Sequence, residues 1–198
     1  MLAKTKKSGF QEKLLFLYRF LQTPGQIGSV TPSSKFLAKK MVDAVPWNEV
    51  YSVAELGAGT GAITKYIHAA KRIHTRVLLF EKDTHLRKEL QKQYRNFSCY
   101  EDCQELQTVL KLEELSHVDC IISGLPFYNF PQAIRDKLVE QIIESLKDEG
   151  WFIAFQYSKQ MKKQLEEHFD VIDIQFVPLN VPPAFVYVCK KKKSVERS

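Results

Sequence analysis

The chain has 198 residues, of which 44% are hydrophobic and 26% are charged, a balance that indicates a soluble globular protein with one α/β domain of ordinary size. No apolar run approaches the roughly 18 residues of a membrane-spanning helix, and charged residues interrupt the N-terminal segment too soon for a signal peptide, so we expect a cytoplasmic protein. The net charge of +6 is concentrated at the ends, because residues 1–40 carry eight Lys or Arg and one acid, and residues 190–198 carry five and one. Such basic ends favour an anionic partner, either a phospholipid surface or nucleic acid, with improved solubility as the alternative.

An amphipathic helix is expected over residues 10–22. Its apolar sector is wide, because Phe10, Leu14, Leu17 and Leu21 lie nearly in line on a helical wheel and aromatic residues flank them. A helix that is basic, aromatic and amphipathic suits a membrane interface. Packing of the same face over the rest of the domain is the alternative that the sequence leaves open.

A second helix is expected over residues 33–44. The preceding Thr31-Pro32-Ser33-Ser34 supplies hydroxyl groups for an N-cap and an early proline, and Pro46 ends the helix. Residues 23–28 contain a proline and two glycines and form a loop that could act as a lid. Residues 1–47 are therefore expected to form an N-terminal helical segment.

A glycine-rich turn follows a short β-prone run and precedes a helical pattern. Its three glycines come at alternate positions and are Gly57, Gly59 and Gly61. Glycine lets the backbone approach a ligand closely, because no Cβ intervenes. A dinucleotide site has G-x-G-x-x-G spacing and binds a pyrophosphate, whereas here Glu55 precedes the first glycine and would attract a cation. A second acid, Glu81, follows the apolar residues 77–80, where it could pair with a ribose.

Beyond the turn, strands and helices alternate, which predicts a parallel sheet covered by helices on both faces. Strands are expected near residues 51–56, 77–82, 97–101, 118–123, 150–156, 171–177 and 184–189, and helices near 62–71, 84–94, 104–111, 132–147 and 159–168. Only residues 178–183 separate the last two strands, so these should form an antiparallel hairpin at the sheet edge. Ligands of such open sheets bind beyond the carboxyl ends of the strands. We expect a domain over residues 48–190 and a basic tail over 191–198.

Four cysteines fall in or beside the predicted strands. They are Cys99, Cys103, Cys120 and Cys189. They lack C-x-x-C spacing and nearby histidine pairs, which favours buried or neutral thiols over disulfides or zinc. No metal site is expected.

The turn of residues 55–61 resembles the first motif of the class I S-adenosylmethionine-dependent methyltransferases, which has the form E-x-G-x-G-x-G. The resemblance implies a Rossmann-like α/β fold with seven strands, and S-adenosylmethionine as the cofactor. It places the amino-acid part of the cofactor at the turn and the ribose hydroxyls at Glu81. It also implies that Asp102 accepts a hydrogen bond from the adenine amino group, with Glu101 as the alternative. The remaining possibility is that both acids are simply solvated and bind nothing. The cofactor-binding residues expected on this basis are Thr31, Ser33, Ser34, Glu55, Leu56, Gly57, Ala58, Gly59, Gly61, Glu81, Lys82, Asp102, Cys103 and Ser123.

The segment Ser123-Gly124-Leu125-Pro126-Phe127 ends the fourth predicted strand, where the methyl acceptor should meet the cofactor. The overall pattern is similar to that of the ribosomal RNA adenine N6-dimethyltransferases, which carry N-L-P-Y or a related motif here. Serine is shorter than asparagine and cannot make the same paired contact with a base edge, which argues against methylation of a base.

Bacterial phospholipid N-methyltransferases resemble the chain over nearly its whole length. The similarity includes residues 27–34, 55–61, 123–127 with Pro131, and 180–187. It implies stepwise methylation of phosphatidylethanolamine toward phosphatidylcholine at a membrane surface, with the amphipathic N-terminal helix and basic residues as the membrane contact. No stable protein partner is indicated. The alternatives are an RNA adenine methyltransferase, a small-molecule or protein methyltransferase, and a non-catalytic cofactor-binding protein.

Methyl transfer from a sulfonium to an amine is an in-line displacement that depends mainly on positioning and on the exclusion of water. The candidate catalytic residues are Ser123, Gly124, Leu125, Phe127 and Tyr128. Backbone carbonyls of the first three would orient a neutral amine, and the two rings, with Tyr18, would face the positive charge that develops on nitrogen. Packing is the alternative role for the rings. Arg19, Lys35 or Lys39 could pair with a lipid phosphate, and no general base is identified, because His85 and His117 fit surface positions.

Overall fold

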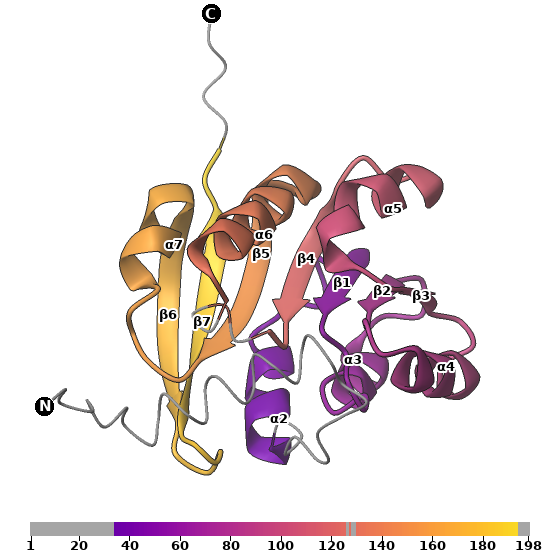
Figure 1. Cartoon of the computed structure of the whole chain (residues 1–198), viewed down its shortest axis with the longest axis horizontal. Coiled ribbons are helices and arrows are strands. Elements are labelled where there is room, and N and C mark those ends of the chain that lie inside the picture. The colour runs from indigo at the N-terminus through magenta and orange to yellow at the C-terminus, as the bar shows by residue number, and fades with distance from the viewer. Residues whose placement is uncertain (1–33, 126, 128–129, 194–198) are drawn as a thin grey trace, which may run out of the picture.

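The computed structural model describes residues 34–125, 127 and 130–193. Seven strands form one sheet with the order β3-β2-β1-β4-β5-β7-β6 (Figure 1). The strands are β1 (Ser52–Leu56), β2 (Arg76–Phe80), β3 (Ser98–Tyr100), β4 (Val118–Ser123), β5 (Leu146–Gln156), β6 (Phe169–Val177) and β7 (Ala184–Lys191). The predicted α/β class and the C-terminal antiparallel hairpin are confirmed. The sequence did not predict that β7 lies between β5 and β6, antiparallel to both.

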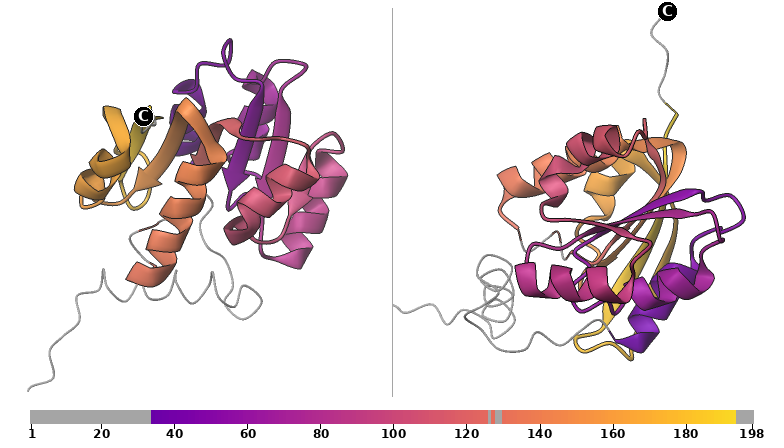
Figure 2. Two further views of the ribbon diagram at one scale, coloured as in Figure 1. Left: turned by 90° about the horizontal axis from the view of Figure 1, so that it is seen from above. Right: turned by 90° about the vertical axis from the view of Figure 1, so that its right-hand side faces the viewer.

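Helices cover both faces of the sheet, as expected from the alternation of elements (Figure 2). They are α2 (Lys35–Asp43), α3 (Thr64–Ala70), α4 (Thr84–Gln93), the short 3₁₀ helix η1 (Cys103–Glu105), α5 (Leu106–Leu112), α6 (Gln132–Ser145) and α7 (Lys162–His168). One hydrophobic core lies under α2, α3 and α4, and a second lies under α5, α6 and α7. The helices predicted within the described residues therefore exist within a few residues of their expected bounds.

The central strands are apolar on both sides because both faces of the sheet are covered. In β2, Val77 and Leu79 contribute to the core under α2 to α4, whereas Leu78 and Phe80 contribute to the opposite core. This alternation follows from the two-residue period of a strand. It also brings the carboxyl ends of β1, β2, β3 and β4 to the same edge of the sheet, because these strands are parallel.

The strand β5 begins at Leu146, earlier than the sequence indicated. The Lys-Asp-Glu-Gly segment that follows Leu146 has the composition of a turn, and Glu149 adopts a positive φ of 59°. Leu146 is nevertheless fully buried and pairs with Val118, across an irregularity in the β4–β5 register. Tertiary pairing therefore extends the strand through a segment whose local composition disfavours it.

The helix α2 packs on the sheet. Leu37, Ala38 and Met41 are fully buried in the core that α3 and α4 also cover. The predicted helix over residues 10–22 lies outside the described residues, and the division at residues 47 and 48 stays a prediction. Across the described part of the chain, none of the helices has both the length and the apolar character that a bilayer crossing demands.

Candidate active site

The glycine turn joins β1 to α3 and adopts backbone conformations that favour glycine. Gly57, Gly59 and Gly61 have φ values of 77°, 56° and 80°. A Cβ atom on Gly57 would lie 2.6 Å from Cδ2 of Leu125, and one on Gly61 would lie 3.1 Å from Cδ2 of Leu90. A Cβ atom on Gly59 would meet nothing within 4 Å. The outer glycines therefore permit close packing, whereas Gly59 borders open space that a ligand can enter.

The turn is fixed to its neighbours by the backbone. The amides of Gly57 and Ala58 donate to the Phe80 carbonyl at 2.9 and 3.0 Å, which holds the turn at the end of β2. The Leu56 carbonyl accepts from the Gly124 amide at 2.8 Å, which ties the end of β1 to the segment after β4. The predicted site residues of three strand ends are thus held together by main-chain hydrogen bonds.

Glu55 is a fully buried acid in β1. The Thr64 hydroxyl donates to its Oε2 at 2.7 Å, and its Oε1 has no hydrogen-bond partner among the described residues. Burial raises the pKa of Glu55 to about 8, and the nearby Glu81 carboxylate adds to this rise. A buried carboxyl oxygen without a partner is costly unless it meets a donor or a cation. Glu55 is therefore suited to a ligand that carries an ammonium group.

Glu81 follows β2 and connects it to the glycine turn. Its Oε2 accepts from the Gly59 amide at 2.6 Å, and its Oε1 accepts from the Asp83 amide at 2.8 Å. Burial raises the pKa of Glu81, against the lowering effect of these two amides. A carboxylate can accept about four hydrogen bonds, so each oxygen retains capacity for a ligand hydroxyl.

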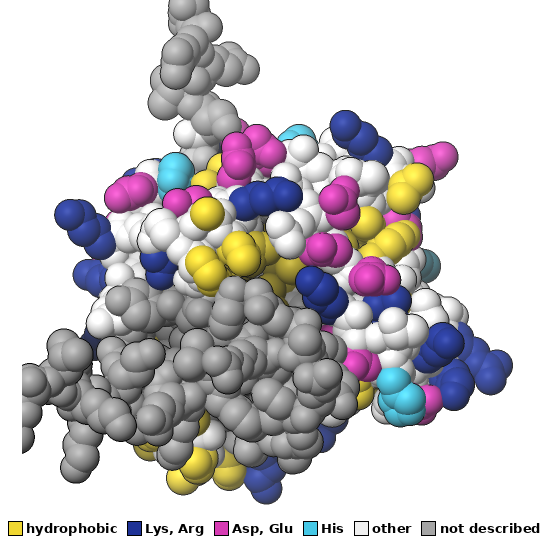
Figure 3. All heavy atoms as spheres, viewed as in Figure 1, with side chains coloured by type: hydrophobic (Ala, Val, Ile, Leu, Met, Phe, Trp, Pro, Cys, Tyr) yellow, Lys and Arg dark blue, Asp and Glu magenta, His cyan; other side chains and the backbone are white. Residues whose placement is uncertain are grey.

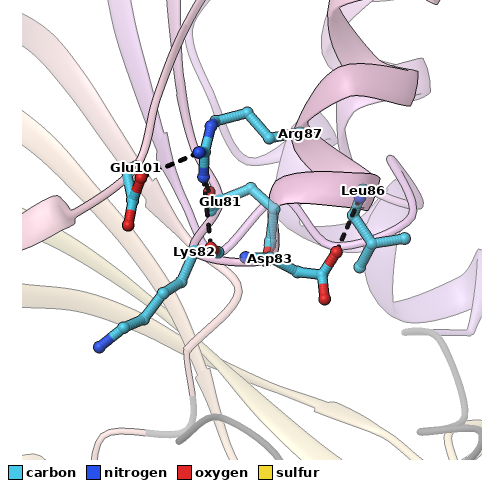
Figure 4. A network of polar contacts seen from close by, with 6 residues as sticks. All are labelled: Glu81, Lys82, Asp83, Leu86, Arg87 and Glu101. Atoms are coloured by element: carbon cyan, nitrogen blue, oxygen red, sulfur yellow. Dashed lines mark hydrogen bonds and ion pairs between the residues drawn. The ribbon is translucent and has the colours of Figure 1, made fainter. Parts of the chain in front are cut away.

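Arg87 holds the loops after β2 and β3 in place (Figure 4). Its Nη1 donates to the Glu81 carbonyl at 2.7 Å and to the Lys82 carbonyl at 3.2 Å, and its Nη2 pairs with the Glu101 carboxylate at 2.9 Å. The sequence interpretation did not include Arg87. Its place one turn inside α4, just after the second acid of the pattern, is the signal that could have indicated it, because a planar guanidinium can bridge several acceptors there.

A pocket of about 130 Å³ lies beside these loops. Six predicted site residues line it, from all four strand ends: Gly57, Glu81, Lys82, Asp102, Cys103 and Leu125. Phe130, Ile134 and Leu138 form an apolar wall that the sequence interpretation missed. The structure therefore brings a part of the predicted site residues to one pocket, and it adds a hydrophobic side contributed by α6 and by Phe130, two residues before that helix.

Asp102 and Cys103 begin η1 at the pocket. Asp102 caps the helix, because its Oδ1 accepts from the Gln104 amide at 2.9 Å. Burial raises the pKa of the Cys103 thiol to about 12, and the Asp102 carboxylate adds to the rise, so this thiol is neutral at pH 7. Glu101, the alternative to Asp102, also lines the pocket but is paired with Arg87.

The segment after β4 packs on the glycine turn. Ser123 is fully buried, and its Oγ accepts from the Leu125 amide at 3.1 Å, so its hydroxyl orders this turn. A Cβ atom on Gly124 would lie 2.8 Å from the Gly57 carbonyl oxygen. Phe127 is 1% exposed and contacts Phe130 and Phe152 edge to face. This burial favours the packing role for Phe127, which does not line the pocket, whereas Phe130 does.

The remaining predicted residues lie elsewhere. Ser34 caps α2 by accepting from the Leu37 amide at 3.2 Å, and its own amide donates to Asn180 Oδ1 at 3.1 Å in the loop between β6 and β7. It does not line the pocket. The predicted residues Thr31, Ser33 and Tyr128, together with Tyr18 and Arg19, lie outside the described residues. His85 and His117 are exposed, as expected.

These features fit S-adenosylmethionine. Its ammonium matches the unpartnered Oε1 of Glu55, its hydroxyls match Glu81, and the space over Gly59 allows close approach to the backbone. The pocket between the ends of β2, β3 and β4 combines acids with an apolar wall, which suits an adenosine.

Comparisons with known proteins agree with this geometry. No protein-family model matches the chain. The ornithine lipid N-methyltransferase of Singulisphaera acidiphila is 32% identical over 186 residues, which cover 90% of this chain and 96% of that protein.

Two solved structures share the fold and bind a cofactor product. The 1,6-didemethyltoxoflavin-N1-methyltransferase of Burkholderia thailandensis, with bound S-adenosylhomocysteine, matches with a TM-score of 0.66 and 14% identity, over 98% of this chain and 94% of its own. The N-methyltransferase NodS of Bradyrhizobium japonicum, in complex with S-adenosylhomocysteine, matches with a TM-score of 0.64 and 11% identity, over 91% of this chain and 98% of its own. At these identities the likeness concerns the fold alone.

Proposed function

This chain belongs to the class I S-adenosylmethionine-dependent methyltransferases that methylate lipid amines, and we propose that its acceptor is the amine of phosphatidylethanolamine and of its methylated derivatives. The chain is thus an enzyme of the methyltransferase class, with S-adenosylmethionine as its cofactor. The observation that carries the choice of a lipid amine over a base is the segment after β4. There Ser123 is fully buried, its Oγ accepts from the Leu125 amide, and its side chain is too short to make the paired contact with a base edge that an asparagine makes.

The residues predicted for the cofactor have separate tasks in this reaction, two of them, Glu81 and Asp102, lining the pocket and one, Glu55, buried in β1. Bound S-adenosylmethionine supplies an electrophilic methyl group on a sulfonium. Glu55 would pair with the ammonium of the cofactor, Glu81 would accept from its ribose hydroxyls, and Asp102 would accept from its adenine amino group. An ammonium beside Oε1 of Glu55 favours the charged carboxylate over the protonated form that burial otherwise stabilises.

The acceptor amine enters beside the segment after β4. It must be neutral, because only the free lone pair attacks carbon. Backbone carbonyls of residues 123–125 orient it, and the wall of Phe130, Ile134 and Leu138 excludes water. Positioning and water exclusion provide the rate enhancement. The proton that the product amine loses passes to solvent, since the pocket contains no histidine among its described residues.

The enzyme works at a membrane surface in this proposal. Residues 10–22, which lie outside the described residues, form the amphipathic membrane contact. Lys35 and Lys39 on α2 or Arg19 pair with the lipid phosphate. The excess of basic residues in residues 1–40 supports this arrangement.

An ornithine lipid is the second candidate acceptor, because the relative that is 32% identical is an ornithine lipid N-methyltransferase. Both lipids present a primary aliphatic amine, which the same pocket can orient. They differ in the headgroup, because phosphatidylethanolamine has a phosphate and an ornithine lipid has a carboxylate.

Methylation of defined lipids tests these proposals. The full chain is incubated with labelled S-adenosylmethionine and detergent micelles of phosphatidylethanolamine or of an ornithine lipid, and the products are separated by thin-layer chromatography. We expect mono-, di- and trimethylated products from phosphatidylethanolamine. Label in the ornithine lipid alone would overturn the choice of phosphatidylethanolamine and leave lipid N-methylation in place. Label in structured ribosomal RNA, with neither lipid modified, would contradict the lipid assignment itself.

A further inference from the structure

Apolar side chains remain exposed where α2 meets the loop between β6 and β7. Phe36 is 45% exposed, Phe176 54%, Leu179 61% and Val181 82%. We call these four side chains the hairpin surface. In Figure 3, hydrophobic side chains and a basic side chain are seen together at the lower edge of the molecule, where Figure 1 places α2 and this loop.

Three of the four side chains of the hairpin surface are contiguous. Phe36 of α2 lines one shallow surface pocket with Phe176 and Leu179 of the hairpin, although these residues are about 140 positions apart in the sequence. The ring of Phe176 lies 5.1 Å from that of Phe185, its direct partner on the neighbouring strand, and packs beside it. Single exposed apolar residues are normal, but a group on one edge marks an interaction site.

A buried asparagine holds the loop so that its apolar side chains point outward. Asn180 is 4% exposed; its Oδ1 accepts from the Ser34 amide at 3.1 Å and its Nδ2 donates to the Pro182 carbonyl at 2.8 Å. Its two neighbours in sequence, Leu179 and Val181, are among the most exposed apolar residues of the structure. The exposure therefore belongs to a loop that is fixed at its centre.

The charges around the hairpin surface are positive. Lys35, Lys39 and Lys40 lie on α2, and Lys159 lies 5.2 Å from the centre of the Phe185 ring. Residues 174–187 contain no charged side chain at all. On α2 the first acid is Asp43 in its last position, and it pairs with Lys39. Apolar side chains bordered by lysines match a bilayer that contains anionic lipids.

The hairpin surface faces the same way as the active site. Because β6 and β5 are both antiparallel to β7, the loop after β6 lies at the edge of the sheet where β4 and β5 also end. That edge carries residues 123–125, beside which the acceptor amine enters. A bilayer against the hairpin surface would therefore lie on the acceptor side of the molecule.

We propose that the hairpin surface docks onto an anionic phospholipid bilayer, with Phe36, Phe176, Leu179 and Val181 at the boundary between headgroups and acyl chains and the lysines at lipid phosphates. This docking site is separate from the expected helix over residues 10–22. It rests on the proposed function only in that a lipid-modifying enzyme must meet a bilayer.

Vesicle sedimentation with matched variants tests the docking. The full chain and its Leu179→Ser/Val181→Ser variant are mixed with vesicles of phosphatidylcholine, with and without phosphatidylglycerol. We expect the variant to bind the anionic vesicles about tenfold or more weakly, since two apolar side chains lose their burial. The control is Ile73→Ser/Leu112→Ser, which removes two exposed apolar side chains away from the hairpin surface and should bind within about twofold of the wild type. Equal binding by both variants would overturn the proposal.

Fluorescence gives a second readout that does not depend on affinity. The fluorescence of the Leu179→Trp variant should be quenched by brominated acyl chains, and that of the Ile73→Trp variant should not, over the background of the two native tryptophans. Loss of self-association in Leu179→Ser/Val181→Ser, with vesicle binding unchanged, would identify the surface as a contact between copies and would contradict docking.

Methyl transfer to lipid in detergent micelles separates this proposal from the proposed function. If micellar lipid is methylated but the Leu179→Ser/Val181→Ser variant binds vesicles as tightly as the wild type, the docking site is wrong and the function stands. If the protein binds vesicles through the hairpin but methylates no lipid, the function is wrong and the docking site stands.

Discussion

The two halves of the sheet edge that forms the active site are built differently. Around β1, β2 and β3, buried acids and backbone amides hold one another through hydrogen bonds, as Glu81 does with Gly59 and Asp83. From β4 to β7 the edge is apolar, with Phe130 at the pocket and Leu179 at the surface. A cationic, polar cofactor requires fixed charges, whereas an amine on a lipid requires dry surfaces and a route from a bilayer. Under the proposed function, cofactor binding should depend on electrostatics, and acceptor binding should depend on shape and water exclusion.

The largest expected effect concerns the point where the halves touch. Gly57→Ala combines a positive φ, which costs about 1–2 kcal/mol for a residue with a Cβ, with an overlap at Leu125 that costs about 1–3 kcal/mol. We expect the free energy of unfolding, measured in urea, to fall by about 2–5 kcal/mol and cofactor binding to be lost. Gly59→Ala is the control, because its Cβ meets open space and only the φ cost applies. Equal losses for the two variants would contradict the packing role of Gly57.

Glu55→Gln tests the electrostatic half directly. The amide keeps the size of the side chain but cannot attract an ammonium, so we expect affinity for S-adenosylhomocysteine to fall about 10–100-fold, the range of a hydrogen bond to a charged group. Isothermal titration calorimetry measures the change. Glu49→Gln, at an exposed acid outside the pocket, is the matched control. An unchanged affinity of Glu55→Gln would remove Glu55 from the cofactor site.

The raised pKa of Glu55 gives stability a dependence on pH. Between about pH 5 and pH 8 the folded protein holds a proton on Glu55 that the unfolded chain has released. The free energy of unfolding should therefore fall as pH rises through this range, by up to about 1.4 kcal/mol per unit from this group, and the fall should end above pH 8. Urea unfolding of wild type and Glu55→Gln at several pH values isolates the effect. Parallel curves would mean that Glu55 ionises in the folded protein at its ordinary pKa.

The smallest expected effects come from Arg87 and Asn180, each of which holds the loops of one half in place through hydrogen bonds. Arg87→Ala releases the loops after β2 and β3, and we expect cofactor affinity to fall about 3–10-fold, because one bridging charged group is lost. Arg95→Ala, at an exposed arginine beyond the end of α4, is its control.

Asn180→Ala releases the hairpin loop in the other half. It should lower the free energy of unfolding by about 1 kcal/mol, since the Ser34 amide and the Pro182 carbonyl lose their partner. Cofactor affinity should stay within about twofold of the wild type if the halves are independent. A larger drop in affinity would show that the loop and the cofactor site are coupled.

The two halves also differ in how many of their site residues could be predicted from the sequence. The glycines, Glu55 and Glu81 follow a local pattern of one turn and the strand ends on either side of it, and hydrogen bonds hold this turn at the ends of β1 and β2. The burial of Phe127 and the wall of Phe130, Ile134 and Leu138 depend on how α6 packs on the sheet. No local pattern encodes that packing.

Contacts over long separations escaped prediction for the same reason. The Ser34–Asn180 hydrogen bond joins residues 146 positions apart. Leu146 enters β5 only because Val118 is available as its partner. The alternation of strands and helices predicted the class of the fold, but the place of β7 between β5 and β6 depends on which sheet edge is free once β5 has formed.

The contact between Gly57 and Gly124 has a consequence for redesign and for evolution. With 2.8 Å between a hypothetical Gly124 Cβ and the Gly57 carbonyl, neither segment can gain a side chain without displacing the other. A graft that exchanges the acceptor segment of residues 123–125 must therefore carry a compatible cofactor turn with it. The hairpin loop is not among the groups that crowd Gly57, Gly59 or Gly61, so a lineage can vary the proposed docking surface there while the cofactor turn is inherited unchanged.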